Sequence, residues 1–291
     1  MPRPAVLVIA ATDSSGGAGL TRDVRVLTDF GVDALCVVTA VTAQSDKKVT
    51  AVHHVPPEVI RAQIAAAFAT RQIGAIKIGM LGTQATVEAV VAELSAVRPT
   101  SGESTRMGGQ SGGSPLGASA RAEGQRQGSG LAASVAAAIP IVVDPVLVST
   151  SGGVLLDAGG QAALTGSLFR IATLVTPNVP EAAALLGEPL AADEADLIRQ
   201  GERLLGFGSY AILLKAGHPY AGGTDTEEAV DLLISGASIE RIASKRVVGS
   251  SRGTGCALAS GIAAELAAGK PLSEACRAAK HYVLGMLAPV S

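Results

Sequence analysis

Short runs of Val and Ile, separated by longer alanine- and leucine-rich segments, constrain the fold of this 291-residue chain more than any other feature. The runs have no polar face, which is typical of parallel strands buried on both sides. They predict strands at Ala5–Ala11, Ala34–Ala40, Ala75–Ile78, Ile139–Val143, Leu174–Thr176 and Ala211–Lys215. The segments between them predict helices at Gly19–Asp29, Glu58–Ala69, Ala85–Leu94, Pro180–Leu186, Asp193–Leu205, Thr254–Ala267 and Leu272–Leu287. This alternation indicates an α/β fold with a mainly parallel central sheet, which binds ligands at the carboxyl ends of its strands.

One segment departs from the alternating pattern. Between Ser101 and Gly130 the chain contains nine Gly and six Ser, and no apolar face repeats along it. Such a composition favours flexible chain over a packed element. We therefore interpret about 98–135 as a disordered insertion in a single domain that spans 1–291.

The composition excludes several classes of function. A formal net charge of −2 argues against nucleic acid as a partner. No apolar stretch is long enough to cross a bilayer, which argues against a membrane protein. The three cysteines are widely spaced and odd in number, so they predict neither a disulfide framework nor a zinc site. A reducing, cytoplasmic location fits best, and a homodimer remains open.

The strongest motif is Gly253-Thr254-Gly255-Cys256, which opens a helix whose apolar side chains recur every four residues. Two glycines at a helix start let free backbone N–H groups and the positive helix end approach an anion closely. Cys256 lies in this first turn, where the pKa of a thiol is expected to fall, so it is a candidate base for a substrate hydroxyl. The alternative is a glycine-rich helix cap that holds a small core cysteine.

A second glycine-rich motif, Asp13-Ser14-Ser15-Gly16-Gly17-Ala18-Gly19, follows the first predicted strand. It contains neither the dinucleotide-binding fingerprint nor the phosphate-loop ending. Asp23 follows in the next helix, where an acid can point toward the glycines. The alternative is a tight turn beside a solvated acid.

A third motif, Thr176 to Glu181, places Asn178 and Glu181 three residues apart at a helix start. Oxygen ligands of this kind suit a hydrated Mg²⁺ beside phosphates, although the same spacing also forms a capping box. Asp144 follows another strand and could help to place Mg²⁺ or phosphates, or could belong to a simple turn.

Three further polar side chains lie within or at the ends of predicted strands. The Gln44 amide can both donate to and accept from an aminopyrimidine edge. Lys77 is a charge within an apolar run, which is costly without an anionic partner, and Lys215 ends another strand. Cys36 and Cys276 are expected to pack in the core, and the adjacent His53 and His54 are expected at the surface.

In their order along the chain, these motifs resemble the hydroxymethylpyrimidine/phosphomethylpyrimidine kinase family of thiamine biosynthesis, within the ribokinase-like superfamily. The resemblance rests on seven segments: Asp13 to Asp23, Thr39 to Gln44, Lys77 to Gly82, Val143 to Gly152, Thr176 to Glu181, Lys215 to His218 and Gly253 to Cys256. It implies one three-layer αβα sandwich that uses ATP and Mg²⁺.

The resemblance also implies roles for individual residues. Asp23 and Gln44 match positions that contact the pyrimidine, and Met80 and Val146 match positions that line the ring pocket. Gly253, Gly255 and Cys256 match the anion hole and the catalytic cysteine, with Lys215 as a catalytic cation. The resemblance implies that the nucleotide is bound by Lys77, Asn178, Lys215 and Thr254. It implies that Mg²⁺ is bound by Glu181 and Asp144. Most ribokinase-like relatives carry Asp at the position of Cys256, which favours the pyrimidine kinases over sugar kinases.

The sequence therefore predicts ATP-dependent phosphorylation of hydroxymethylpyrimidine and of its monophosphate. The alternatives are a pyridoxine or pyridoxal kinase, and a non-catalytic ligand-binding protein on the same fold. The family usually has Asn-Thr-His before Gly-Thr-Gly-Cys, whereas this chain has Ser250-Ser251-Arg252. Arg252 adds a positive charge beside the anion hole and could favour a phosphorylated substrate.

Overall fold

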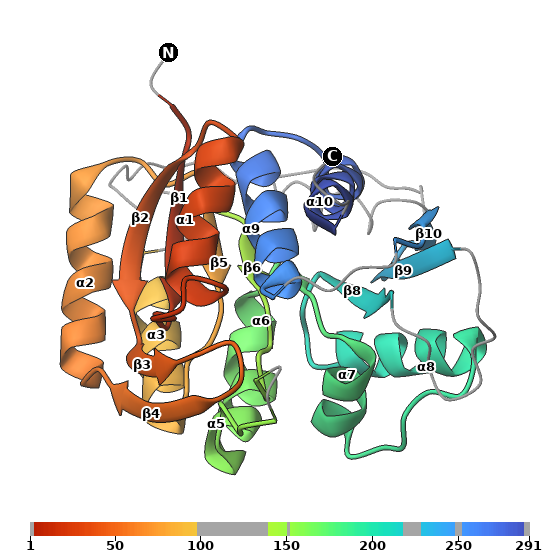
Figure 1. Cartoon of the computed structure of the whole chain (residues 1–291), viewed down its shortest axis with the longest axis horizontal. Coiled ribbons are helices and arrows are strands. Elements are labelled where there is room, and N and C mark those ends of the chain that lie inside the picture. The colour runs from red at the N-terminus through yellow and green to blue at the C-terminus, as the bar shows by residue number, and fades with distance from the viewer. Residues whose placement is uncertain (1–2, 98–138, 150–151, 218–227, 248–251, 288–291) are drawn as a thin grey trace, which may run out of the picture.

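A computed structural model describes residues 3–97, 139–149, 152–217, 228–247 and 252–287. They form three layers, with helices on both faces of a central sheet (Figure 1). The insertion predicted at about 98–135 lies outside the described residues.

The central sheet has eight strands in the order β10-β9-β8-β7-β6-β5-β1-β2. Six of them are parallel, and β9 pairs antiparallel with both β8 and β10. The strands are β1 (Ala5–Ala10), β2 (Asp33–Val38), β5 (Ala75–Ile78), β6 (Ile141–Val143), β7 (Leu174–Val175), β8 (Ala211–Ala216), β9 (Glu228–Ser235) and β10 (Ile239–Lys245). A separate antiparallel hairpin consists of β3 (Ala40–Gln44) and β4 (Val49–His54).

Two apolar clusters hold the helices against the sheet. On one face, branched side chains such as Val8 pack against α1 (Gly19–Asp29), α9 (Thr254–Ala267) and α10 (Leu272–Leu287). On the other face, side chains such as Leu7 pack against the remaining helices. These are α2 (Pro57–Thr70), α3 (Gln84–Val97), α5 (Ala158–Ala163), η1 (Leu164–Leu168), α6 (Phe169–Ile171), α7 (Val179–Leu186) and α8 (Glu194–Leu205). Each side chain of the fully buried strand β1 therefore meets one of two apolar layers.

The strand–helix alternation confirms the predicted α/β fold, but four strands and one helical segment were missed. The hairpin β3–β4 is largely exposed and β10 carries charged residues, so neither has the apolar run that identified the buried strands. The continuous helical stretch from α5 through η1 to α6 contains glycines at its start and a π-helical turn. These interruptions weaken its helical periodicity in the sequence.

The cysteines and histidines only partly match their predicted positions. Cys276 is buried as predicted, and both His53 and His54 are exposed on β4. The prediction that Cys36 is buried is wrong, because β2 is the outermost strand of the sheet and its Cys36 faces solvent. Among the described residues, no helix is both long and apolar enough to cross a bilayer.

A buried ion pair fastens α10 to the antiparallel edge of the sheet. The Lys280 ammonium donates to the Asp231 carboxylate at 2.9 Å and to the backbone carbonyls of Ala229 and Ile242. Asp231 also accepts from the backbone N–H of Ala216. The three hydrogen bonds of the ammonium offset its desolvation, so losing the cation leaves a buried carboxylate without compensation.

We expect Lys280→Met to lower the free energy of unfolding by about 3–5 kcal/mol, because it strands the buried Asp231 charge. Arg277→Met is the matched control, since Arg277 lies on the same helix as Lys280 and pairs with Glu240 of β10, but its side chain is largely exposed. That change should cost at most about 1 kcal/mol. Urea unfolding at constant ionic strength measures both, and equal losses would contradict the assignment.

Candidate active site

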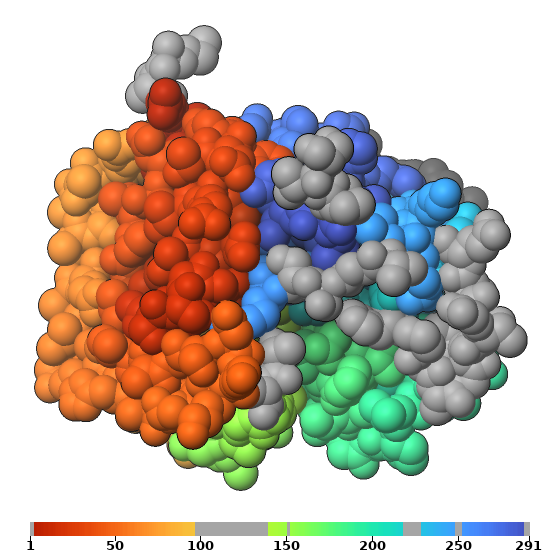
Figure 2. Space-filling model, in the orientation of Figure 1, coloured from red at the N-terminus to blue at the C-terminus, as the bar shows by residue number. Residues whose placement is uncertain are grey.

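A cavity of about 560 Å³ opens at the carboxyl ends of the parallel strands. The hairpin strand β3 borders one side and α7 the other, and both elements appear on the face shown in Figure 2. Of the thirteen residues predicted for the site, twelve line this cavity, and Asp23 does not. Those lining it are Gln44, Lys77, Met80, Asp144, Val146, Asn178, Glu181, Lys215, Gly253, Thr254, Gly255 and Cys256.

The glycine turn between β1 and α1 is organised by the buried Asp13 carboxylate. Its oxygens accept hydrogen bonds from the backbone N–H and hydroxyl of Ser15 and from the backbone N–H of Ala18. The Ser14 hydroxyl donates to the carbonyl of Gln44 and accepts from its N–H, each at 2.8 Å. The turn therefore anchors the end of β3 and fixes the backbone from which the Gln44 side chain extends.

The first residues of α9 pack directly on this turn. Gly253, the N-cap, has φ +75°, and a Cβ there would lie 2.3 Å from the carbonyl oxygen of Gly17. A Cβ on Gly255 would lie 3.3 Å from the Lys215 ammonium. Gly253 is therefore required by its positive φ and its close approach to backbone, whereas a side chain at Gly255 would press on the Lys215 ammonium. The free N–H groups of the helix start thus reach the cavity, as an anion site needs.

A compact acid–base cluster lies against this helix start. The Lys215 ammonium is 2.9 Å from Asp144 Oδ1 and 3.8 Å from Glu181 Oε2. Burial alone would lower the pKa of Lys215, but the two carboxylates raise it above its usual value. Lys215 is therefore a cation at neutral pH and presents its charge to the cavity.

The Asn178 and Glu181 motif forms the capping box that was its alternative interpretation. The Asn178 side chain accepts from the backbone N–H of Glu181, and the Glu181 carboxylate accepts from the N–H of Asn178. Burial raises the pKa of Glu181, and the nearby Lys215 opposes the shift. Glu181 thus has two structural partners and still lines the cavity, so the capping role does not exclude contact with a ligand.

Asp23 and Lys77 form a fully buried ion pair beneath the cavity. The Lys77 ammonium is 2.8 Å from Asp23 Oδ2, and the Ser260 hydroxyl donates to Asp23 Oδ1 at 2.8 Å. Neither charged side chain has any exposed surface. The oxygens of Asp23 are thus occupied by Lys77 and Ser260 beneath the cavity, and its predicted contact with the pyrimidine stays a prediction. The Lys77 ammonium is likewise engaged by Asp23, while Lys77 also belongs to the floor of the cavity, and its predicted contact with the nucleotide stays a prediction.

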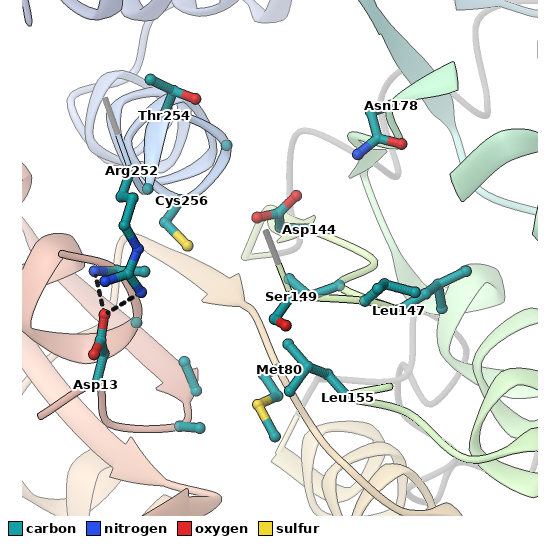
Figure 3. Close-up of a pocket in the computed structure, with 18 of the residues that line it drawn as sticks. Asp13, Met80, Asp144, Leu147, Ser149, Leu155, Asn178, Arg252, Thr254 and Cys256 are labelled. Carbon is teal, nitrogen blue, oxygen red and sulfur yellow. Dashed lines mark hydrogen bonds and ion pairs between the residues drawn. The ribbon is translucent and has the colours of Figure 1, made fainter. Parts of the chain in front are cut away.

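Cys256 points its sulfur into the cavity, with Asp144 on the opposite side (Figure 3). Burial raises the pKa of the thiol to about 11, although the Lys77 cation and a hydrogen bond from the Gly19 N–H oppose the shift. The expected fall in this pKa at the helix start is therefore wrong. Desolvation outweighs the helix end and the cation, and the thiol is protonated at neutral pH.

The apolar part of the cavity suits a small ring. Met80 and Val146 lie here as predicted, and the sequence analysis missed their neighbours Leu147 and Leu155. Leu147 and Leu155 flank an isolated antiparallel bridge between Val148 and Val154, and these apolar residues are too few to stand out in the sequence as a strand pair. The Gln44 side chain borders the same space. Its amide forms no hydrogen bond with any other described residue, so it is free to meet a ligand.

Oxygen donors suitable for Mg²⁺ are present, although no cluster of three or more potential metal ligands occurs within the described ranges. The carboxylates of Asp144 and Glu181 both approach Lys215, so they lie close to one another. A hydrated Mg²⁺ uses one or two carboxylates together with phosphate oxygens. The donor set therefore fits a metal that arrives with a phosphorylated ligand and not a permanent protein-bound ion.

An αβα sandwich with a glycine-rich helix start and buried lysines at its strand ends is the framework of a ribokinase-like small-molecule kinase. A family model for phosphomethylpyrimidine kinase matches residues 13–101 and 129–289. The chain belongs to this family, which confirms the predicted resemblance and makes the protein a phosphotransferase. The unmatched residues 102–128 fall within the predicted insertion.

Individual relatives agree with this assignment. The chain is 37% identical over 278 residues to a hydroxymethylpyrimidine/phosphomethylpyrimidine kinase of Rhizobium meliloti, covering 95% of this chain and 88% of the relative. It is 31% identical to the Escherichia coli kinase of the same description, covering 91% and 83%. A crystal structure of phosphomethylpyrimidine kinase from Clostridium difficile superposes with a TM-score of 0.73 at 29% identity, covering 98% of this chain and 100% of the other.

Pyridoxal kinases share the same fold. The structure of the Staphylococcus aureus enzyme in complex with AMP-PCP and pyridoxal superposes with a TM-score of 0.74 at 24% identity, covering 99% of this chain and 88% of the other. At this identity the likeness establishes the common architecture only.

We expect the alkylation rate of Cys256 to rise about tenfold per pH unit between about pH 7 and pH 9 without a plateau. The reason is that only the thiolate reacts, and its fraction grows tenfold per unit below a pKa of about 11. Iodoacetamide labelling of a Cys36→Ser protein, followed by peptide mass spectrometry, measures the rate without interference from the exposed Cys36. The double variant Cys36→Ser/Cys256→Ala gives the background, and a plateau near neutral pH would contradict the prediction.

Proposed function

We propose that this protein transfers a phosphoryl group from ATP to hydroxymethylpyrimidine and then to its monophosphate, as a thiamine-biosynthesis kinase of the cytoplasm. The observation that carries the proposal is that one cavity combines three features. The first is an apolar wall that suits a small ring, next to the side-chain amide of Gln44, which has no hydrogen-bond partner among the described residues. The second is a glycine-rich helix start, and the third is the Lys215 cation. The family membership and the names of the relatives support the same activity.

In the proposed reaction, the ring lies against Met80 and Val146, and the Gln44 amide pairs with its polar edge. The free N–H groups at the start of α9 receive the phosphoryl group as charge accumulates on its oxygens. Lys215 adds a positive charge next to Gly255. In the first transfer the minor thiolate form of Cys256 accepts the proton of the attacking hydroxyl and ADP leaves; in the second transfer a phosphate oxygen of the monophosphate attacks. Most of the acceleration comes from positioning and electrostatics, because phosphoryl transfer asks little covalent chemistry of the protein.

The co-substrate is proposed to be ATP with Mg²⁺. Asn178, Lys215 and Thr254 border the part of the cavity assigned to the nucleotide phosphates, and Asp144 and Glu181 are proposed to hold the metal. When bound, Mg²⁺ would neutralise phosphate charge. Lys77 has a different proposed role: from beneath the cavity its buried ammonium favours the anionic form of Cys256.

Two alternatives make different forecasts. A pyridoxal kinase would prefer a pyridine alcohol, and that reading is supported here by fold likeness alone. A non-catalytic binding protein would bind the pyrimidine or the nucleotide without turnover. Competition between hydroxymethylpyrimidine and pyridoxal in one ATP-consumption assay distinguishes a pyrimidine kinase from a pyridoxal kinase. Detection of phosphorylated product distinguishes either kinase from a non-catalytic binding protein.

We expect Gln44→Ala to weaken pyrimidine binding by about 1–3 kcal/mol, because a polar edge of the ring loses its partner in a desolvated pocket. The Michaelis constant for ATP should stay unchanged and serves as the internal control. Steady-state kinetics with each substrate varied in turn measures both constants. An equal rise for ATP and pyrimidine would remove Gln44 from ring recognition.

Mass-spectrometric detection of mono- and diphosphate products from hydroxymethylpyrimidine, ATP and Mg²⁺ tests the proposed function directly. In this assay Cys256→Ala should lower turnover by roughly 10²–10⁴, the usual effect of losing a general base. Because the thiol has a pKa of about 11, wild-type turnover should rise with pH across the neutral range. Cys256→Asp should keep part of the activity and lose that rise, since a carboxylate is already ionised. A Cys256→Ala enzyme within a few-fold of wild type would leave catalysis to the backbone anion site.

A further inference from the structure

Arg252 lies where three segments of the cavity wall meet. It directly precedes Gly253 at the start of α9, and its guanidinium borders the cavity. One nitrogen donates to the Asp13 carboxylate at 3.2 Å, as Figure 3 shows. The other donates to the Ser15 hydroxyl and to Asp46, each at 2.8 Å. Arg252 thus connects the glycine turn, the helix start and the turn between β3 and β4.

The two carboxylates that contact Arg252 are held very differently. Asp13 is buried and fixed by its own hydrogen bonds to the glycine turn. The side chain of Asp46 is 82% exposed in the β3–β4 turn, and Arg252 is its one ion-pair partner among the described residues. Exposed ion pairs of this kind contribute little to stability. The contact with Asp13 is therefore permanent, whereas an anion of higher charge can replace Asp46.

We propose that Arg252 binds the phosphate already present on a phosphorylated acceptor, exchanging its contact with Asp46 for the phosphate oxygens. This inference rests on the proposed function and names the residue that distinguishes its two substrates. A planar guanidinium pairs well with a phosphate monoester, which carries more charge than a carboxylate. The uncharged alcohol gains nothing from this cation. Arg252 is thus a specificity residue for the second phosphorylation.

The position of Arg252 suits this role. The same cavity holds Gln44, which is assigned to the ring, and the helix start that follows Arg252 in the chain. An acceptor with its ring at Gln44 directs its substituent toward the helix start. In the monophosphate this substituent is the phosphate, one oxygen of which attacks ATP while the other oxygens face the wall that Arg252 forms. The backbone carbonyl of Arg252 accepts from the Arg22 guanidinium, which also donates to Gly17. The arginine is therefore anchored at its main chain while one edge of its side chain can change partners.

The test compares kcat/KM for hydroxymethylpyrimidine and for its monophosphate at saturating ATP. Arg252→Gln should lower the value for the monophosphate by about tenfold or more, as expected for losing a hydrogen bond to a charged group. The value for the alcohol should change by less than about threefold. Asp46→Asn should act in the opposite direction and raise the value for the monophosphate, because the competing charge is removed. Lys47→Gln, which removes an exposed charge from the same turn, is the matched control and should leave the ratio of the two values unchanged.

The outcomes separate this inference from the proposed function. Failure of the wild-type protein to phosphorylate either acceptor overturns the proposed function. Equilibrium dialysis with the monophosphate in the absence of ATP then tests Arg252 independently, and equal binding by wild type and Arg252→Gln overturns the inference. An equal loss for both acceptors also overturns it, because it assigns Arg252 to supporting the glycine turn. If Arg252→Gln does not fold, the Asp46→Asn variant tests the proposal instead, because Asp46 is exposed. An unchanged ratio of kcat/KM for the monophosphate to kcat/KM for the alcohol in this variant counts against the proposal.

Discussion

The contact between two stretches of backbone is the constraint on which the cavity depends. The N-cap of α9 lies so close to the glycine turn after β1 that a single Cβ at Gly253 would collide with the carbonyl of Gly17. Because both stretches are backbone, neither can rotate away as a side chain does. Their approach fixes the helix start at the strand ends and places the Gly19 N–H against the Cys256 sulfur. The position of the Cys256 thiol is thus set by the main chain.

Buried cations then give this backbone framework its electrostatic character. Lys77 lies below Cys256 and Lys215 lies beside Gly255, and each is kept charged by a buried aspartate. Two cations near one helix start favour negative charge in the cavity, while their paired carboxylates keep the resting protein close to neutral there. A buried pair of this kind adds little stability over apolar residues. The ion pair instead holds a positive charge in a fixed position, so the protein need not rearrange to stabilise a phosphoryl group.

The sequence predicted the buried sheet well because apolar runs report burial on both faces. It also predicted which residues share the cavity, since polar groups at the ends of parallel strands must converge at one edge. It did not predict the direction of the Cys256 pKa shift, because desolvation depends on the whole surroundings of the sulfur and not on its place in a helix. The buried partner of Asp23 was not predicted for a similar reason. An acid one turn into a helix points either at a ligand or at a buried lysine, and the pairing with Lys77 is set by tertiary packing. Cys36 was misassigned because strand order, which places β2 at the edge, cannot be deduced from an apolar run.

The hairpin β3–β4 carries Gln44 but shares no strand pairing with the eight-stranded sheet. Its largely exposed residues can therefore change with little effect on the core, while the helix start and its cations stay in place. One wall of the cavity can thus vary independently of the framework that holds the helix start, because the two belong to separate sheets.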